Sequence, residues 1–213
     1  MMTDRLMHLR KRIDEYEQEF EASLAERRKA LRYRLEGTRA VFEEDALKAH
    51  KALKKSIAKT LADARLRNLI AAPFIYAVII PIALLDFLAS SYQHVCFRLW
   101  NIPRVKRREF VIIDRHRLGY LNWIQKFNCL YCEYSNGVLP YVVEIASRTE
   151  QYWCPIKHAV RPNNPHKRYY EFIDYGDGEE LDEKWERRRM HLHDENNRMA
   201  NVAAEQSGGS ESA

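Results

Sequence analysis

The chain has 213 residues, with 35 lysines and arginines, 30 aspartates and glutamates, and a formal net charge of +5. This length allows one or two domains. A basic excess suits a protein that lies against anionic lipid, where each nearby lysine or arginine contributes about 1 kcal/mol. Nucleic acid is not expected as a partner, because basic residues alternate with acidic ones in the N-terminal region and otherwise gather beside one apolar stretch.

Residues 1–68 are predicted to form one long charged helix. From Arg5 to Arg67 there is no proline and a single glycine, Gly37, which is a candidate hinge. An eleven-residue repeat, which keeps an apolar stripe on one helix face, places apolar residues at Leu9, Phe20, Leu31, Phe42 and Leu53. The stripe favours self-association in a coiled coil. Contact with a membrane surface and packing on the chain's own C-terminal domain are the alternatives.

Residues 69–100 form a predicted membrane segment. No residue from Leu69 to Leu85 is charged, and a helix needs about 20 mostly apolar residues to cross a bilayer. Because lysines and arginines flank the stretch on both sides, both flanks are expected in the cytoplasm. A single span and a re-entrant hairpin bent near Pro81 are both consistent with the pattern. Asp86 is expected to face protein, water or lipid headgroups, because a carboxylate in hydrocarbon is costly.

A signal peptide and a buried core helix are the two other interpretations of this segment. A signal peptide is excluded, because the stretch follows a long charged region and no small-residue cleavage site comes soon after it. A buried core helix of a soluble domain is the remaining alternative, but the charged flanks are poorly suited to covering so long an apolar helix.

Residues 101–178 are predicted to form a small helical domain. The elements expected there are a short strand or helix start at Phe110–Asp114, a helix at Leu118–Phe127, a turn at Asn136-Gly137 and a second helix at Val138–Trp153. A charged helix is expected over residues 179–204. The remaining residues, 205–213, are predicted to be a disordered tail.

The cysteines supply the candidate site. Cys129 and Cys132 form a CxxC pair that resembles the knuckle of rubredoxins and zinc ribbons, and Cys154 and His158 would complete a Cys3His metal site. Zinc is the expected ion and iron the alternative. A straight helix over Val138–Trp153 would hold Cys154 too far from the pair, so the site requires that helix to bend. Thiol redox chemistry at the CxxC pair and inert structural cysteines are the other hypotheses.

Signs of an enzyme are few. The chain has no glycine-rich phosphate loop, no GxSxG elbow and no HExxH motif. Cys154 and His158 have the spacing of a thiolate–imidazolium pair on a helix, but such pairs often occur by chance. Cys96, beside aromatic residues, is expected to be a small buried apolar side chain. The sequence identifies no catalytic residue and no small-molecule substrate, and it favours a non-enzymatic protein.

Three stretches of the sequence resemble a family of uncharacterised proteobacterial membrane-associated proteins. They are DRHRLGYLNWIQKFNCLYCEYSNG at 114–137, EIASRTEQYWCPIKHA at 144–159 and YEFIDYGDGE at 170–179. The resemblance implies a location at the bacterial inner membrane and no particular activity.

The predicted fold is mainly α: a long N-terminal amphipathic or coiled-coil helix, one hydrophobic membrane segment and a small helical C-terminal domain with a cysteine knuckle. The predicted function is that of a membrane-anchored scaffold or interaction protein, with the lipid bilayer and a second copy of the chain as partners. A membrane-associated redox or rubredoxin-like electron-transfer protein that uses Cys129 and Cys132 is the alternative.

Overall fold

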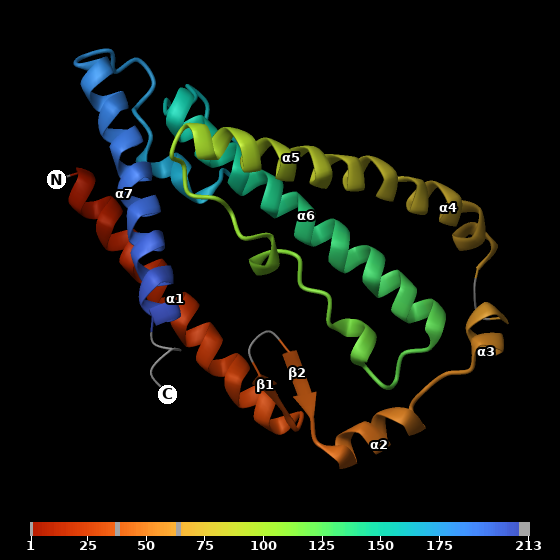
Figure 1. Cartoon of the computed structure of the whole chain (residues 1–213). Coiled ribbons are helices and arrows are strands. Elements are labelled where there is room, and N and C mark those ends of the chain that lie inside the picture. The colour runs from red at the N-terminus through yellow and green to blue at the C-terminus, as the bar shows by residue number, and fades with distance from the viewer. Residues whose placement is uncertain (1, 37–38, 63–64, 209–213) are drawn as a thin grey trace. The chain divides into compact units, whose positions relative to one another are not determined.

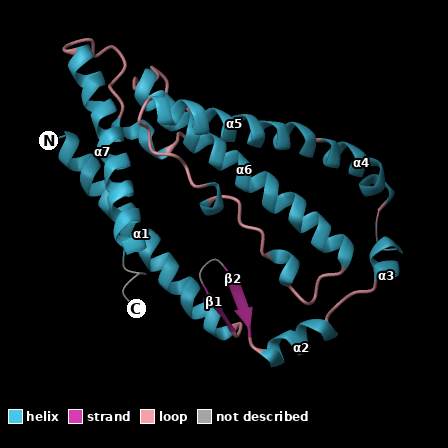
Figure 2. Ribbon diagram, viewed as in Figure 1, coloured by secondary structure: helices cyan, strands magenta, loops and turns pink. Residues whose placement is uncertain are grey.

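The computed structural model describes residues 2–36, 39–62 and 65–208, and it is mainly helical (Figures 1 and 2). Its elements are the helices α1 (Met2–Ala30), α2 (Glu44–Ala52), α3 (Ile57–Ala62), α4 (Leu66–Ala77), α5 (Ile79–Leu99), α6 (Trp123–Trp153) and α7 (Leu181–Gly208), the strands β1 (Tyr33–Glu36) and β2 (Arg39–Phe42), and the short 3-10 helices η1 (Arg107–Glu109), η2 (Arg115–Arg117) and η3 (Lys167–Glu171).

The chain folds into two units. Unit 1 consists of residues 1–64 and 113–130, and unit 2 consists of residues 65–112 and 131–213. The apolar segment predicted from the sequence therefore begins the second unit. The chain enters unit 2 at Arg65, returns to unit 1 at Ile113 and leaves it again within α6.

The prediction of one long helix over residues 1–68 is wrong. Helix α1 ends at Ala30, and an antiparallel hairpin follows in which Tyr33 pairs with Phe42. Their rings lie 5.1 Å apart, the kind of cross-strand aromatic contact that stabilises a hairpin. The eleven-residue repeat misled because Phe42 belongs to this strand. The predicted hinge at Gly37 lies outside the described residues.

Helices α4 and α5 follow one another without a reversal of the chain (Figure 1). Of the two arrangements that the sequence allows for this segment, the hairpin bent near Pro81 is therefore not formed. Proline has no backbone N–H and its ring clashes with the carbonyl of the residue four positions earlier, which here is Ala77, the last residue of α4. Pro81 thus interrupts the helix at Val78, but it lies in the first turn of α5, where proline is tolerated.

Helix α6 is continuous where the sequence predicts a turn. Asn136 and Gly137 lie within it, so the predicted helices at Leu118–Phe127 and Val138–Trp153 are replaced by one helix that starts at Trp123. The glycine has a packing role. A Cβ atom added at Gly137 would lie 2.7 Å from the Cα of Val111 and 2.8 Å from the carbonyl oxygen of Phe110. Gly137 is therefore needed for the close approach of this segment, not for a turn.

The predicted charged C-terminal helix is confirmed. Helix α7 begins at Leu181 and extends to Gly208, which is beyond the predicted end at residue 204. Arg168 of the η3 turn attaches it to α6, since its guanidinium donates to Glu195 of α7 at 3.0 Å and to Glu144 of α6 at 3.2 Å. A cluster of buried apolar side chains in unit 2 comes from α5, α6, α7 and the segment between α5 and η1, and contains Phe97, Ile102, Val105, Tyr141, Ile145 and Leu192.

The close approach at Gly137 gives a first prediction. Gly137→Ala should lower the free energy of unfolding by about 1–3 kcal/mol, because the added methyl group overlaps backbone atoms of Val111 and Phe110 that cannot rotate away. Chemical unfolding followed by circular dichroism in one detergent measures this loss. Gly178→Ala is the matched control, since a Cβ there has no neighbour within 4 Å. Equal stability of the two variants would contradict the packing role.

Candidate membrane-attachment site

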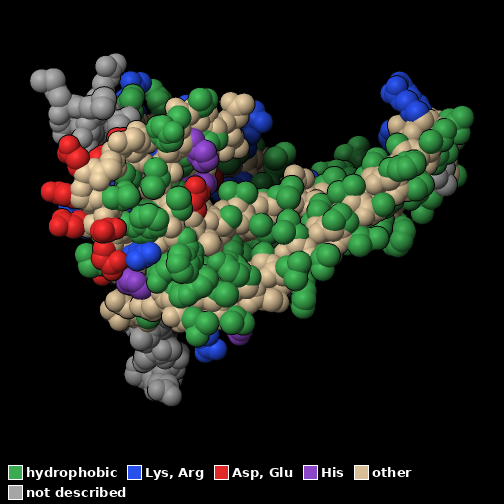
Figure 3. Space-filling model, turned by 90° about the horizontal axis from the view of Figure 1, so that it is seen from above, with side chains coloured by type: hydrophobic (Ala, Val, Ile, Leu, Met, Phe, Trp, Pro, Cys, Tyr) green, Lys and Arg blue, Asp and Glu red, His purple; other side chains and the backbone are tan. Residues whose placement is uncertain are grey.

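Helices α4 and α5 together form an apolar arm, Leu66–Leu99, which among the described residues is the one helical stretch long and apolar enough to cross a membrane. No part of its most apolar 18-residue window is buried. Phe74 of α4 is 75% exposed, and Leu84 and Phe87 of α5 are 56% and 66% exposed. Figure 3 shows hydrophobic side chains gathered along the whole arm. A contiguous apolar surface of this extent is typical of a membrane or protein contact.

The inner face of α5 is polar. Asp86, Ser90 and Gln93 follow one another at spacings of four and three residues, so they project from the same side of the helix. Phe97 continues this side, and both it and Asp86 are buried. The exposed apolar residues Leu84 and Leu88 project from the opposite side. Tertiary packing therefore gives α5 a polar inner face and an apolar outer face.

Asp86 is held by Arg107 of η1 and Tyr134 of α6. The guanidinium donates to both carboxylate oxygens, with Nε at 3.1 Å from each and Nη2 at 2.7 Å from Oδ2. The Tyr134 hydroxyl donates to Oδ2 at 2.9 Å. These hydrogen bonds to Asp86 raise the pKa of Arg107, although burial opposes the shift. Burial, followed by the bond to Asp86, raises the pKa of Tyr134, so the phenol keeps the proton that it donates.

Gln93 fixes the segment that follows α5. Its Oε1 accepts a hydrogen bond from the backbone N–H of Val105 at 2.9 Å, and its Nε2 donates to the carbonyl oxygen of Val105 at 3.3 Å. Nε2 also donates to the hydroxyl of Tyr141, which lies 3.0 Å from the hydroxyl of Ser90. Each polar side chain on the inner face of α5 thus has partners in α6 or in the returning segment. Buried polar groups with such partners avoid the cost of desolvation.

The sequence prediction for Asp86 is confirmed, since this carboxylate faces protein. Arg107 and Tyr134, which are its partners, were not identified from the sequence. A lone acid inside an apolar stretch signals that a partner exists. Nothing in the spacing of the sequence identifies which arginine or tyrosine it is.

The four predicted metal ligands do not lie together as a Cys3His site requires. Cys129 and Cys132 lie one turn apart within α6, not in the tight turn of a knuckle. Cys154 follows the end of the same helix, which rises about 30 Å between Cys132 and Trp153 at 1.5 Å per residue. A zinc–sulfur bond measures about 2.3 Å. The structure therefore separates Cys154 from the CxxC pair, because α6 does not bend as the site required.

The remaining predicted ligand, His158, is exposed and its ring stacks on Tyr169 at 6.0 Å. In the part of the chain that the structure describes, no group of three or more histidine, cysteine or acidic side chains is close enough to hold a metal ion. Cys96 is partly buried. A bound zinc or iron ion stays a prediction from the sequence.

Comparisons of the chain with protein-family models, with curated proteins and with solved structures find no match. The resemblance of residues 114–179 to proteobacterial membrane-associated proteins also stays a prediction.

The ion pair of Asp86 gives a second prediction. Arg107→Met should destabilise the protein by about 1–3 kcal/mol, because a buried carboxylate loses its bidentate donor. Thermal and chemical unfolding of the purified protein measure the change. Arg108→Met is the control. It removes the same charge from a neighbouring exposed position that has no contact with Asp86. If both variants lose equal stability, the ion pair with Asp86 does not account for the contribution of Arg107 to stability.

Proposed function

We propose that the protein is a membrane-attached scaffold whose apolar arm lies within one leaflet of a bilayer, with the polar parts of the chain on a single side. The observation that carries the proposal is the division of α5 into a buried polar face and an exposed apolar face. A helix with such faces at a membrane lies in the interface, with its apolar side toward the acyl chains.

Charge at both ends of the arm supports lipid as the occupant of the apolar surface. Arg65 and Arg67 lie at its start, and Arg98 and Arg104 lie at or just beyond its end. Lysine and arginine at these places attract anionic headgroups, while the residues between them contact hydrocarbon. A soluble partner protein would need a matching apolar groove about 50 Å long, since the arm has 34 residues at 1.5 Å rise each.

The path of the chain supports attachment from one side. Unit 1 joins residues that precede the arm to residues that follow it. Asn122 Nδ2 donates to Thr60 Oγ1 at 2.6 Å and to the carbonyl oxygen of Lys55 at 3.4 Å. The rings of His50 and Tyr120 lie 5.1 Å apart. If the arm crossed the bilayer once, these partners would be on opposite sides.

A second crossing by the segment after the arm is inconsistent with its composition. Between Asn101 and Ile112, the chain carries four basic residues and one acid, namely Arg104, Lys106, Arg107, Arg108 and Glu109. Only η1, three residues long, is helical there. Unpaired backbone groups and charges are both costly in hydrocarbon. These costs support an arm that leaves the membrane on the side from which it entered.

Helix α1 supplies a surface for the scaffold role. Leu9, Ile13, Tyr16 and Phe20 recur at spacings of four, three and four residues and are exposed. This spacing is that of a coiled-coil seam. Self-association of two chains through α1 is part of the proposal. A bacterial inner membrane with the polar regions in the cytoplasm is the setting that the sequence favours.

The alternative is redox chemistry at Cys129 and Cys132. These two thiols lie one helical turn apart, which is compatible with a dithiol pair or with two ligands of one ion. An iron centre with four thiolates would need cysteines from a second copy of the chain, because Cys154 lies at the other end of α6. Scaffolding is therefore favoured.

Loss of the apolar surface gives the third prediction. The wild-type protein should float with phosphatidylcholine vesicles in a density gradient. The triple variant Ile80→Glu, Leu84→Glu and Phe87→Glu should bind at least about tenfold more weakly, because burying each of these side chains contributes about 1.5–3 kcal/mol. Its control replaces three exposed apolar residues outside the arm, Val160, Tyr175 and Met190, with glutamate. Equal flotation of both triple variants would refute the arm as the anchor.

Attachment from one side gives the fourth prediction. Lys51, before the arm, and Val160, after it, are both exposed. In a protein with its four cysteines replaced by serine, the substitutions Lys51→Cys and Val160→Cys each introduce a single thiol. A membrane-impermeant thiol reagent should label both positions in sealed membrane vesicles of the same orientation and neither in vesicles of the opposite orientation. Detergent-opened vesicles should give full labelling of both. Labelling from opposite sides would establish a single span and overturn the one-leaflet model.

A further inference from the structure

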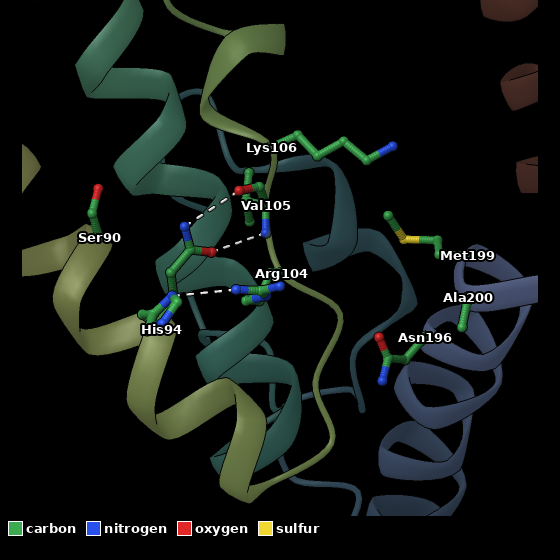
Figure 4. A pocket seen from close by; sticks show the side chains of 9 residues that line it. Ser90, His94, Arg104, Val105, Lys106, Asn196, Met199 and Ala200 are labelled. Carbon is green, nitrogen blue, oxygen red and sulfur yellow. Dashed lines mark hydrogen bonds between the residues drawn. The ribbon is translucent and has the colours of Figure 1, made fainter. Parts of the chain in front are cut away.

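A pocket of about 330 Å³ lies in unit 2 beside the polar end of α5. Its walls come from three segments: Ser90 and His94 of α5, Arg104 and Lys106 of the segment after α5, and Asn196 and Met199 of α7. Figure 4 shows His94 and Arg104 close together, with the α7 residues across the opening. Arg104 Nη1 lies 3.2 Å from His94 Nδ1.

The basic side chains of the pocket are positioned by a rigid wall. The chain is extended around Val105, so alternate residues point to opposite sides. Pro103 and Val105 are buried, and Arg104 and Lys106 are exposed. The two hydrogen bonds between Gln93 and the backbone of Val105 hold this arrangement against α5. Arg104 and Lys106 therefore both face the opening without any cost of ordering the backbone on binding.

The charge of the pocket favours an anion. Its lining contains arginine, lysine and histidine but no aspartate or glutamate. Lys106 has an acidic neighbour outside the pocket, Glu109, at 3.6 Å, and both side chains of that pair are at least half exposed, so water weakens the attraction. An arginine fork beside a lysine is a common arrangement for binding phosphate oxygens.

The location of the pocket identifies the source of the phosphate. His94 follows the exposed Phe87 by seven residues, so both project from the same side of α5, at the border between its polar inner face and its apolar outer face. An interfacial helix is buried about 5–10 Å into the boundary between headgroups and acyl chains. A helix at that depth would place this border, and hence the pocket, at the level of the lipid phosphates.

We infer that this pocket binds the phosphate of an anionic phospholipid headgroup, with Arg104 and Lys106 as the charged contacts. This inference rests on the proposed membrane attachment. The apolar arm supplies binding to any bilayer, and the pocket adds a preference for anionic lipid. Choline headgroups are disfavoured because their own positive charge would face Arg104 and Lys106.

The experiment compares partition of the full-length protein into vesicles of phosphatidylcholine and into vesicles that also contain phosphatidylglycerol. The wild type should prefer the anionic vesicles. The double variant Arg104→Gln, Lys106→Gln should lose about tenfold of that preference, with its binding to phosphatidylcholine unchanged. The control Lys167→Gln, Arg187→Gln removes the same charge from exposed positions of unit 2 outside the pocket, and its preference should stay within about threefold of the wild type.

Each remaining outcome has a distinct meaning. If both double variants lose the same share of the preference for anionic vesicles, the pocket is not a binding site, and general surface charge accounts for the preference. If the wild type does not bind phosphatidylcholine vesicles, the proposed membrane attachment itself is refuted. Binding of inorganic phosphate to the detergent-solubilised protein at Arg104 and Lys106, with no preference for anionic vesicles, would overturn the lipid assignment in favour of a soluble phosphate. The exchange variant Arg104→Lys, Lys106→Arg should keep the preference, which separates loss of charge from loss of fold.

Discussion

The pairing of Asp86 with Arg107 is the interaction on which the arrangement of unit 2 depends. Asp86 interrupts an otherwise apolar helix, and a carboxylate there needs a charged partner that carries hydrogen bonds. Arg107 supplies three, and it comes from a segment that must run back along α5 to reach the carboxylate. The same return places Val105 against Gln93 and brings the backbone of Phe110 and Val111 onto Gly137 of α6.

This return of the chain determines the possible relation to a membrane. Helix α5 is bound on one side through Asp86, Ser90 and Gln93, and its exposed apolar side chains, such as Leu84 and Leu88, project from the other side. Residues 113–130 complete unit 1 with residues that precede the arm, so the chain leaves unit 1 at the start of the arm and returns to it at Ile113. This path of the chain supports the proposed attachment to one leaflet.

The basic pocket and the apolar surface are linked through α5. One side of this helix carries the exposed Phe87 and, seven residues later, His94 of the pocket, so the proposed lipid contact and the proposed phosphate contact lie on one helix. Gln93, which projects inward, fixes the segment that carries Arg104 and Lys106.

The sequence by itself determined the mainly helical composition, the apolar arm, the orientation of Asp86 away from hydrocarbon and the charged C-terminal helix, because composition and local periodicity carry these features. It did not determine the hairpin after α1, where Tyr33 packs on Phe42 across two strands, nor the continuity of α6 through Asn136-Gly137, where the glycine serves close packing. The partners of Asp86, the separation of Cys154 from the CxxC pair and the pocket beside His94 were likewise decided by tertiary structure. Each depends on which distant segments meet, and neither spacing nor residue type encodes that, because many pairings of arginine, tyrosine and cysteine are locally equivalent until the chain has folded.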